Sequence, residues 1–98
     1  MSKDNIKKYR DKIDLIDKKI LRLIQERASH AVSIGKLKSK ISPKSSFYKP
    51  DRETKILRNI IKSNEKGILP DTKIRAIYKE LISGCLSLEE ILKIAYLG

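Results

Sequence analysis

The stretch that decides the fold is residues 4–41, DNIKKYRDKIDLIDKKILRLIQERASHAVSIGKLKSKI, because its apolar residues recur at alternating intervals of three and four. This spacing places them along one side of an α-helix. We call the following residues the heptad stripe: Ile6, Tyr9, Ile13, Ile16, Ile20, Leu23, Ile34, Leu37 and Ile41. Asp4 is a suitable N-cap and no proline occurs before Pro43, so the pattern predicts one unbroken helix over residues 4–41. The alternative is a helix that breaks near Gly35.

A helix of this length is too long for a small domain to cover. At 1.5 Å per residue it is about 57 Å long, whereas a compact chain of 98 residues has a radius of gyration near 13 Å. Two shorter helices from the rest of the chain cannot cover the whole heptad stripe. We therefore expect a second copy of the chain to pack along it, in an intertwined homodimeric helix bundle.

The remainder of the sequence predicts two more helices and no strands. The segment SPKSS, residues 42–46, is typical of a loop, and Pro50 suits the first position of a second helix that ends within 64–67. A third helix is expected from Pro70 or Asp71. Its inward side is predicted to carry the apolar residues Ile74, Ile77, Tyr78, Leu81, Ile82, Cys85 and Leu88. The fold class is therefore all-α, with three helices of which one is very long.

Composition limits the functional classes. The chain has 23 basic and 12 acidic residues and a net charge of +11, which suits either a polyanionic partner or small anionic substrates. The lysines are scattered over every segment and are not interleaved with aromatic residues, so nucleic-acid binding has little support. The sequence has neither an apolar run long enough for a membrane span nor an apolar signal core, and a cytoplasmic location is expected. Cys85 is the only cysteine, which excludes an internal disulfide and a cysteine-based metal cluster.

Two polar residues, Arg27 and His30, occupy positions of the heptad stripe where Ile or Leu is expected. A buried guanidinium needs an anionic partner, which is either a carboxylate of the chain or a bound anion. Lys38 follows Arg27 by 11 residues and lies only about 20° from it around the helix. Between them on the same face, the small Ala31 leaves space for a ligand.

Other charged residues extend this possible anion site. Arg10 lies about 26 Å from Arg27 along the helix axis, so it can reach the same ligand only from a second protomer. Arg52 and Glu53 fall in the first turn of the second helix, where the helix dipole favours the carboxylate and disfavours the guanidinium. Glu89 shares a helix face with Cys85, and it is either a surface acid or part of the site.

Three phrases of the sequence resemble the all-helical type II chorismate mutase family: YRDKIDLIDKKILRLIQERASHAVSIGKLK (9–38), YKPDRE (48–53) and LISGCLSLEE (81–90). They occur in family order at family-like separations. The last five residues, IAYLG (94–98), are similar to the opening strand of a prephenate dehydratase domain. The resemblance implies a mutase domain over 1–93, followed at 94–98 by the start of a truncated dehydratase domain whose residues fray without their sheet.

The resemblance also implies an activity, the rearrangement of chorismate to prephenate in phenylalanine and tyrosine biosynthesis, without cofactor or metal. The active sites are shared across the homodimer. Arg10 of the partner protomer and Arg27 bind the two carboxylates, Lys38 contacts a carboxylate and the ether oxygen, Glu53 binds the ring hydroxyl, and Glu89 donates to the ether oxygen. The family's substrate-binding residues carry over to Arg10, Arg27, Lys38, Lys49, Arg52, Glu53, Cys85 and Glu89, of which Lys38 and Glu89 are the catalytic pair.

Three positions depart from the family pattern. Lys49 replaces a frequent Asp, which is tolerated if only the main chain contacts substrate. Cys85 replaces a frequent Ser, and a thiol is the weaker hydrogen-bond donor. Glu89 stands where some members have Gln, so it must be protonated to donate, which requires a raised pKa from burial or from the nearby anionic substrate.

Two other functions fit parts of the pattern. An isochorismate pyruvate lyase has the same fold and similar cations, although the dehydratase-like end of the chain argues against it. A basic helical module that binds nucleic acid or a protein explains the net charge. It gives no reason for Arg27 on an apolar stripe, nor for Glu53 and Glu89.

Overall fold

The computed structural model describes residues 3–41 and 50–97, which form three helices: α1 (Lys3–Ile41), α2 (Pro50–Ser63) and α3 (Asp71–Leu97). The predicted all-helical class is confirmed, and the described residues contain no strand. The long helix continues through Gly35 without a break. It starts at Lys3, so Asp4 lies in the first turn, where the helix dipole favours a carboxylate, rather than at the N-cap.

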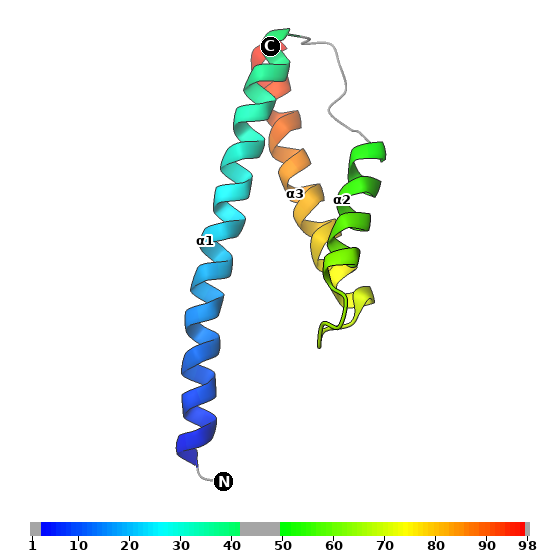
Figure 1. The fold of residues 1–98 in the computed structure, drawn as a ribbon. Coiled ribbons are helices and arrows are strands. Elements are labelled where there is room, and N and C mark those ends of the chain that lie inside the picture. Colours follow the sequence, from blue (N-terminus) through cyan, green and yellow to red (C-terminus); the bar gives the residue numbers. More distant parts are fainter. Residues whose placement is uncertain (1–2, 42–49, 98) are drawn as a thin grey trace.

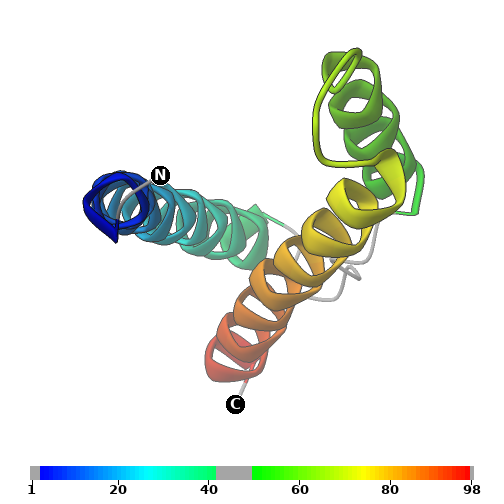
Figure 2. The ribbon, with the colours of Figure 1, turned by 90° about the horizontal axis from the view of Figure 1, so that it is seen from below.

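α3 is the central element of the fold. It packs against the C-terminal half of α1 on one side and against α2 on the other, whereas the described residues of α1 and α2 make no close approach to each other (Figure 1). The view along α1 shows the same separation of α1 from α2 (Figure 2). The molecule measures 60 × 25 × 14 Å, and its radius of gyration of 17.7 Å exceeds the value for a compact chain of this length.

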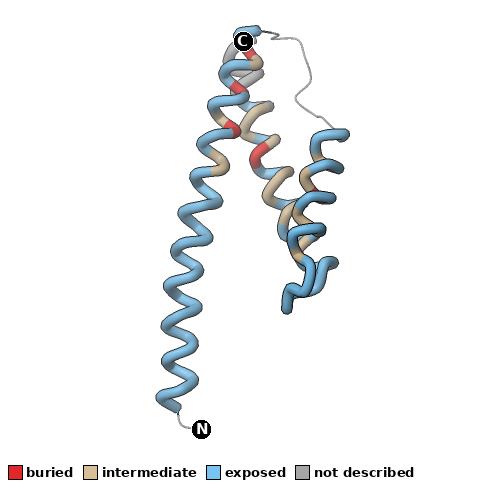
Figure 3. Tube along the Cα trace, viewed as in Figure 1, coloured by how far each residue is buried: buried red, intermediate tan, exposed pale blue. Residues whose placement is uncertain are grey.

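The N-terminal half of α1 packs against no other part of the chain that the structure describes. Every residue from 3 to 26 is exposed, and Figure 3 shows this part of the helix uniformly pale blue. The buried residues of α1 are Ala31, Gly35 and Ser39, which recur every four residues along the side facing α3. Their small side chains allow α3 to approach α1 closely.

The face of α1 that α3 covers is not the heptad stripe. Ile34 and Leu37 of the stripe remain 45% and 59% exposed, although they lie in the half of α1 that α3 contacts. The prediction for the inward side of α3 is wrong at Ile77, which is 52% exposed. The other predicted inward residues of α3 are buried or half-buried.

A tight connection holds α2 and α3 side by side. The side-chain amide of Asn64 donates to the Leu69 carbonyl at 3.1 Å and to the Asp71 carboxylate at 2.7 Å, which ties the end of α2 to the start of α3. Gly67 is required here because a Cβ at this position would collide with the Asn64 side chain. These contacts fix the direction in which α3 leaves the turn.

The C-terminal part of α3 differs from expectation. Residues 94–97 belong to this helix, whereas the sequence predicted frayed residues after 93. The predicted loop at 42–46 lies outside the described residues. A search of the described helices finds none that combines the length and the apolar character needed to cross a bilayer.

Candidate active site

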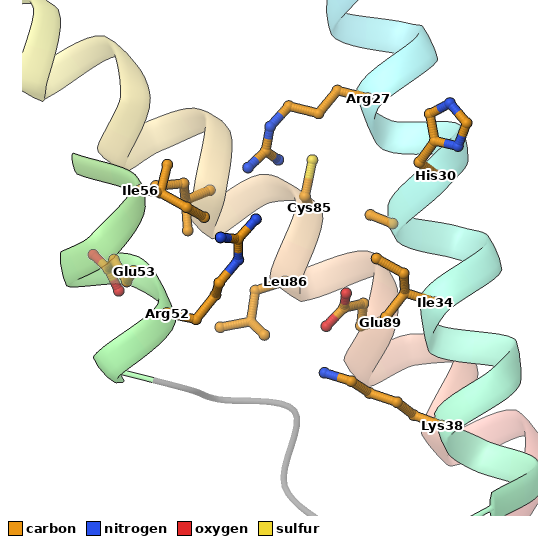
Figure 4. Close-up of a pocket in the computed structure, with 12 residues that line it drawn as sticks. Arg27, His30, Ile34, Lys38, Arg52, Glu53, Ile56, Cys85, Leu86 and Glu89 are labelled. Atoms are coloured by element: carbon orange, nitrogen blue, oxygen red, sulfur yellow. The ribbon is translucent and has the colours of Figure 1, made fainter. Parts of the chain in front are cut away.

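A pocket of about 290 Å³ lies between α1 and α2, with α3 as its floor. All three helices contribute to its lining (Figure 4). α1 provides Arg27, His30, Ala31, Ile34 and Lys38; α2 provides Arg52, Glu53 and Ile56; α3 provides Ile82, Cys85, Leu86 and Glu89. The pocket therefore exists only because α3 holds the other two helices at a fixed separation.

Two guanidinium groups reach into this pocket from opposite walls. Arg27 extends from α1 and Arg52 from the first turn of α2, and both point toward the space between the helices (Figure 4). Within residues 3–41 and 50–97, neither side chain has an ion pair or a hydrogen bond, unlike Lys7, which pairs with Asp11 on the exposed N-terminal half of α1. Two cations without a carboxylate partner create a strong preference for a bound anion.

Lys38 and Glu89 define the other end of the pocket. Lys38 comes from α1 and Glu89 from α3, both side chains are half-buried, and Figure 4 shows their charged ends directed toward the same region. The spacing of 11 residues between Arg27 and Lys38 places both in the pocket lining, as the helical geometry predicted. A ligand with two negative groups can therefore be held at both ends.

Cys85 and Glu53 complete the polar lining. Cys85 is a free thiol, only 7% exposed, in the part of α3 that forms the floor of the pocket. It lies one helical turn before Glu89, and both line the pocket from the same helix face. Glu53 is half-buried in the α2 wall beside Arg52.

Sequence reasoning did not single out the apolar walls, which consist of Ile34, Ile56, Ile82 and Leu86. These residues have no chemical signature that separates them from core residues. Their spacing gives only a weak signal: Leu86 lies three residues and Ile82 seven residues before Glu89, so all three share a face of α3, as many core residues do. Apolar walls suit a ligand that carries a hydrocarbon ring between its charged groups.

One described residue expected at the site, Arg10, does not line this pocket. Arg10 lies on the exposed N-terminal half of α1, about 26 Å along the axis from Arg27. Lys49 lies outside the described residues. A search of the described part of the chain for three or more His, Cys, Asp or Glu side chains able to hold a metal ion finds no such group.

The fold and the pocket together define an all-helical protein whose pocket gathers Arg27, Lys38 and Arg52 between apolar walls. The chain belongs to the type II chorismate mutase family, whose sequence model matches residues 9–90. The family expected from the sequence is therefore confirmed.

Curated relatives carry this family as part of a longer protein. The chain is 47% identical over 90 residues to the bifunctional chorismate mutase/prephenate dehydratase of Neisseria gonorrhoeae, covering 92% of this chain and 24% of the relative. It is 43% identical over 98 residues to the protein of the same name from Aquifex aeolicus, covering 97% of this chain and 26% of that relative. The chain thus spans about a quarter of the length of these relatives.

Proposed function

We propose that this chain converts chorismate to prephenate, a step of phenylalanine and tyrosine biosynthesis. The observation that carries the proposal is the convergence of two unpartnered guanidinium groups and the Lys38 amine on one small pocket with apolar walls. Chorismate is a ring with two carboxylates, and its charges and its hydrocarbon surface match these groups. The family membership of residues 9–90 supports the same reaction.

The reaction is intramolecular: the ether C–O bond of chorismate breaks while a C–C bond forms, and no atom leaves. It requires the flexible ether side chain to be held over the ring. Arg27 and Arg10 of the partner protomer hold it there by fixing the two carboxylates. The pocket walls restrict the ring. Catalysis by positioning needs neither a nucleophile nor a redox group.

Negative charge develops on the ether oxygen as its bond to carbon breaks. Lys38 and Glu89 approach one region of the pocket from different helices, and we assign to them the stabilisation of this oxygen. Lys38 donates as an ammonium, and Glu89 donates as a protonated carboxyl. One such donor lowers the activation barrier by about 3 to 4 kcal/mol, which raises the rate by two to three decades.

The remaining polar residues serve binding. Glu53 accepts a hydrogen bond from the ring hydroxyl, Arg52 adds positive charge opposite Arg27, and the Cys85 thiol donates weakly to a carboxylate. Lys49 contributes its backbone. These roles follow the family pattern, and the position of Glu53, Arg52 and Cys85 in one pocket lining supports them.

The active form is a homodimer with shared sites. The heptad stripe, which this chain leaves exposed along its whole length, is the surface on which a second copy packs. Large exposed apolar stripes of this kind are unfavourable in a monomer. In an antiparallel pair, Arg10 of one protomer reaches the pocket of the other and binds the second carboxylate of chorismate.

The same proposal extends to the protein beyond the mutase domain. The name shared by the relatives supports a prephenate dehydratase domain C-terminal to residue 93, with 94–98 at its start. Chorismate and prephenate would then be processed within one cytoplasmic protein.

The decisive experiment measures chorismate consumption by the purified chain, with the molecular mass determined in the same buffer. We expect prephenate as the product and the mass of a dimer. Isochorismate is the control substrate, because release of pyruvate from it would identify a lyase instead. A chain that consumes neither substrate, or that is monomeric while active, contradicts the proposal.

A further inference from the structure

Tyr9 is the only aromatic residue of the heptad stripe, and the proposed mechanism gives it no role. It directly precedes Arg10, the residue that each protomer is proposed to place in the pocket of the other. Consecutive side chains on a helix point about 100° apart, so Tyr9 does not enter the same space as Arg10. As a member of the stripe, it faces α1 of the partner protomer instead.

Two-fold symmetry determines which part of the partner's α1 Tyr9 meets. The proposed dimer sets Arg10 of one protomer level with Arg27 of the other. Consecutive residues differ by about 1.5 Å along the helix axis, so Tyr9 is then level with Ala28. In a pair of packed helices, a stripe residue inserts into a hole formed by four residues of the facing helix. At this level the hole consists of Ile24, Arg27, Ala28 and Ala31.

This hole suits an aromatic ring. Two of its four residues are alanines, which leave more room than the isoleucines found elsewhere on the stripe. Arg27 and Ala31 also line the pocket, so a ring in this hole lies at the edge of the pocket and against the Arg27 side chain. A planar guanidinium stacks well on an aromatic face. The Tyr9 ring already accepts one cation in its own chain, because Lys12 Nζ lies 5.4 Å from the ring centroid.

The Arg27 side chain needs such a contact. It is half-buried, and among residues 3–41 and 50–97 it has neither an ion pair nor a hydrogen bond. A long side chain without an anchor has several rotamers available, and fixing one of them when substrate binds costs affinity. We propose that Tyr9 of the partner protomer is a positioning residue, whose ring stacks on the Arg27 guanidinium and holds it toward a carboxylate of chorismate. This inference rests on the proposed function.

Loss of the ring should weaken substrate binding rather than slow the chemical step. The carboxylate that Arg27 binds is unchanged in the reaction, so the contact contributes equally before and in the transition state. A partly desolvated cation–π contact changes affinity about three- to tenfold. Tyr9→Leu, which keeps the stripe apolar, should therefore raise KM by this factor with nearly the same kcat. Tyr9→Phe, which keeps the ring, should have the KM of the natural chain.

A matched control comes from another position of the stripe. In the proposed dimer, Ile16 is level with Leu21 of the partner protomer, about 9 Å along the axis from Arg27. Ile16→Leu is also an apolar change in the same interface, and it should leave both KM and kcat as they are. The comparison separates a contact with Arg27 from a general effect on the packing of the two helices.

The contribution from the partner protomer is tested with two complementary inactive chains. One carries Arg10→Ala and the other Arg27→Ala, so the intact sites formed on co-refolding combine Arg27 of the first chain with Arg10 and Tyr9 of the second. Tyr9→Leu is then added to one chain at a time. On the Arg27→Ala chain it should raise KM about three- to tenfold. On the Arg10→Ala chain it should leave KM unchanged, because Tyr9 of that chain serves the site that lacks both arginines.

Three outcomes overturn the inference: the same KM in the two arrangements, a Tyr9→Phe variant with the KM of Tyr9→Leu, or a loss of dimer mass in Tyr9→Leu. The first would mean that Tyr9 acts within its own chain, the second that the ring is not what matters, and the third that Tyr9 acts on assembly. Failure of the proposed function is seen separately, as absence of turnover in the natural chain. A mixture as inactive as its two parents refutes the shared site, and the role of Tyr9 with it.

Discussion

The shared active site can be tested by combining two inactive variants, Arg10→Ala and Arg27→Ala. Both side chains are proposed to bind carboxylates of one chorismate molecule, yet they lie about 26 Å apart along α1 of a single chain. In a dimer, the pocket that uses Arg27 of one protomer uses Arg10 of the other. A heterodimer of the two variants therefore has one site with both arginines and one site with neither.

The expected magnitude follows from counting sites. Each variant alone loses a charge-paired contact to substrate, and kcat/KM should fall at least about a hundredfold. When equal amounts are unfolded together and refolded, about half of the dimers are heterodimers, and each has one intact site of two. The mixture should recover about one quarter of the natural activity, far above either parent.

A matched control comes from Arg27→Ala mixed with Lys38→Ala. Both residues line one pocket from the same chain, so every site in every dimer lacks one of them, and mixing should restore nothing. Activity is measured as chorismate absorbance loss under subsaturating substrate, before and after co-refolding. If the Arg10 and Arg27 mixture stays as inactive as its parents, or if the control pair recovers equally, the shared-site reasoning is refuted.

Four further predictions concern single side chains. Lys38→Ala should lower kcat by two to three decades with unchanged dimer mass, and retention of most activity would exclude Lys38 from the mechanism. Activity should fall as rising pH deprotonates Glu89, and Glu89→Gln should flatten that fall because the amide donates at every pH; an unchanged profile contradicts the role. Cys85→Ser should lower KM a few-fold, since a hydroxyl donates better than a thiol, and a raised KM would argue against a substrate contact. Ser39→Ala should leave the free energy of unfolding unchanged or raise it by about 1 kcal/mol, because the Ser39 hydroxyl, in a residue 2% exposed, has no hydrogen-bond partner among the residues that the structure describes; urea unfolding checks this, and a clear loss of stability contradicts it.

The local structure was predictable because it depends on local signals. The predicted helix 4–41 agrees with Lys3–Ile41, and Pro50 begins α2 as its fixed φ angle favours. The length of the predicted helix relative to the size of the chain also predicted that part of α1 extends beyond the other two helices. Residues 3–26 are indeed exposed.

The docking of α3 on α1 was not predictable from the same pattern. Periodicity shows that a face of a helix must be buried, but it does not show which neighbour buries it. Ala31, Gly35 and Ser39, which contact α3, contribute little to a hydrophobic pattern, and they matter because they are small. The strongly apolar Leu37 stays exposed in this chain. The same ambiguity explains Ile77, an apolar residue that none of the three described helices covers.

The charged site residues were recognisable because they violate the pattern. An arginine at position 27 of an apolar stripe, or at position 52 in the first turn of a helix, is unfavourable for folding and so suggests a ligand. Leu86 is an ordinary apolar residue, and its spacing from Glu89 does not by itself separate a pocket wall from a core residue. Only the placement of α3 reveals it as a wall.

The arrangement of the helices makes the ligand a structural element. Within the described residues α1 and α2 do not meet, so their separation is set by α3, which packs against both. In the proposed complex, Arg27 of α1 binds a carboxylate of chorismate and Glu53 of α2 accepts a hydrogen bond from its ring hydroxyl, so the substrate connects α1 and α2 directly. Because only the bound state contains this connection, we expect substrate binding to stabilise the fold and to fix the pocket in the geometry in which Lys38 and Glu89 are proposed to face the ether oxygen.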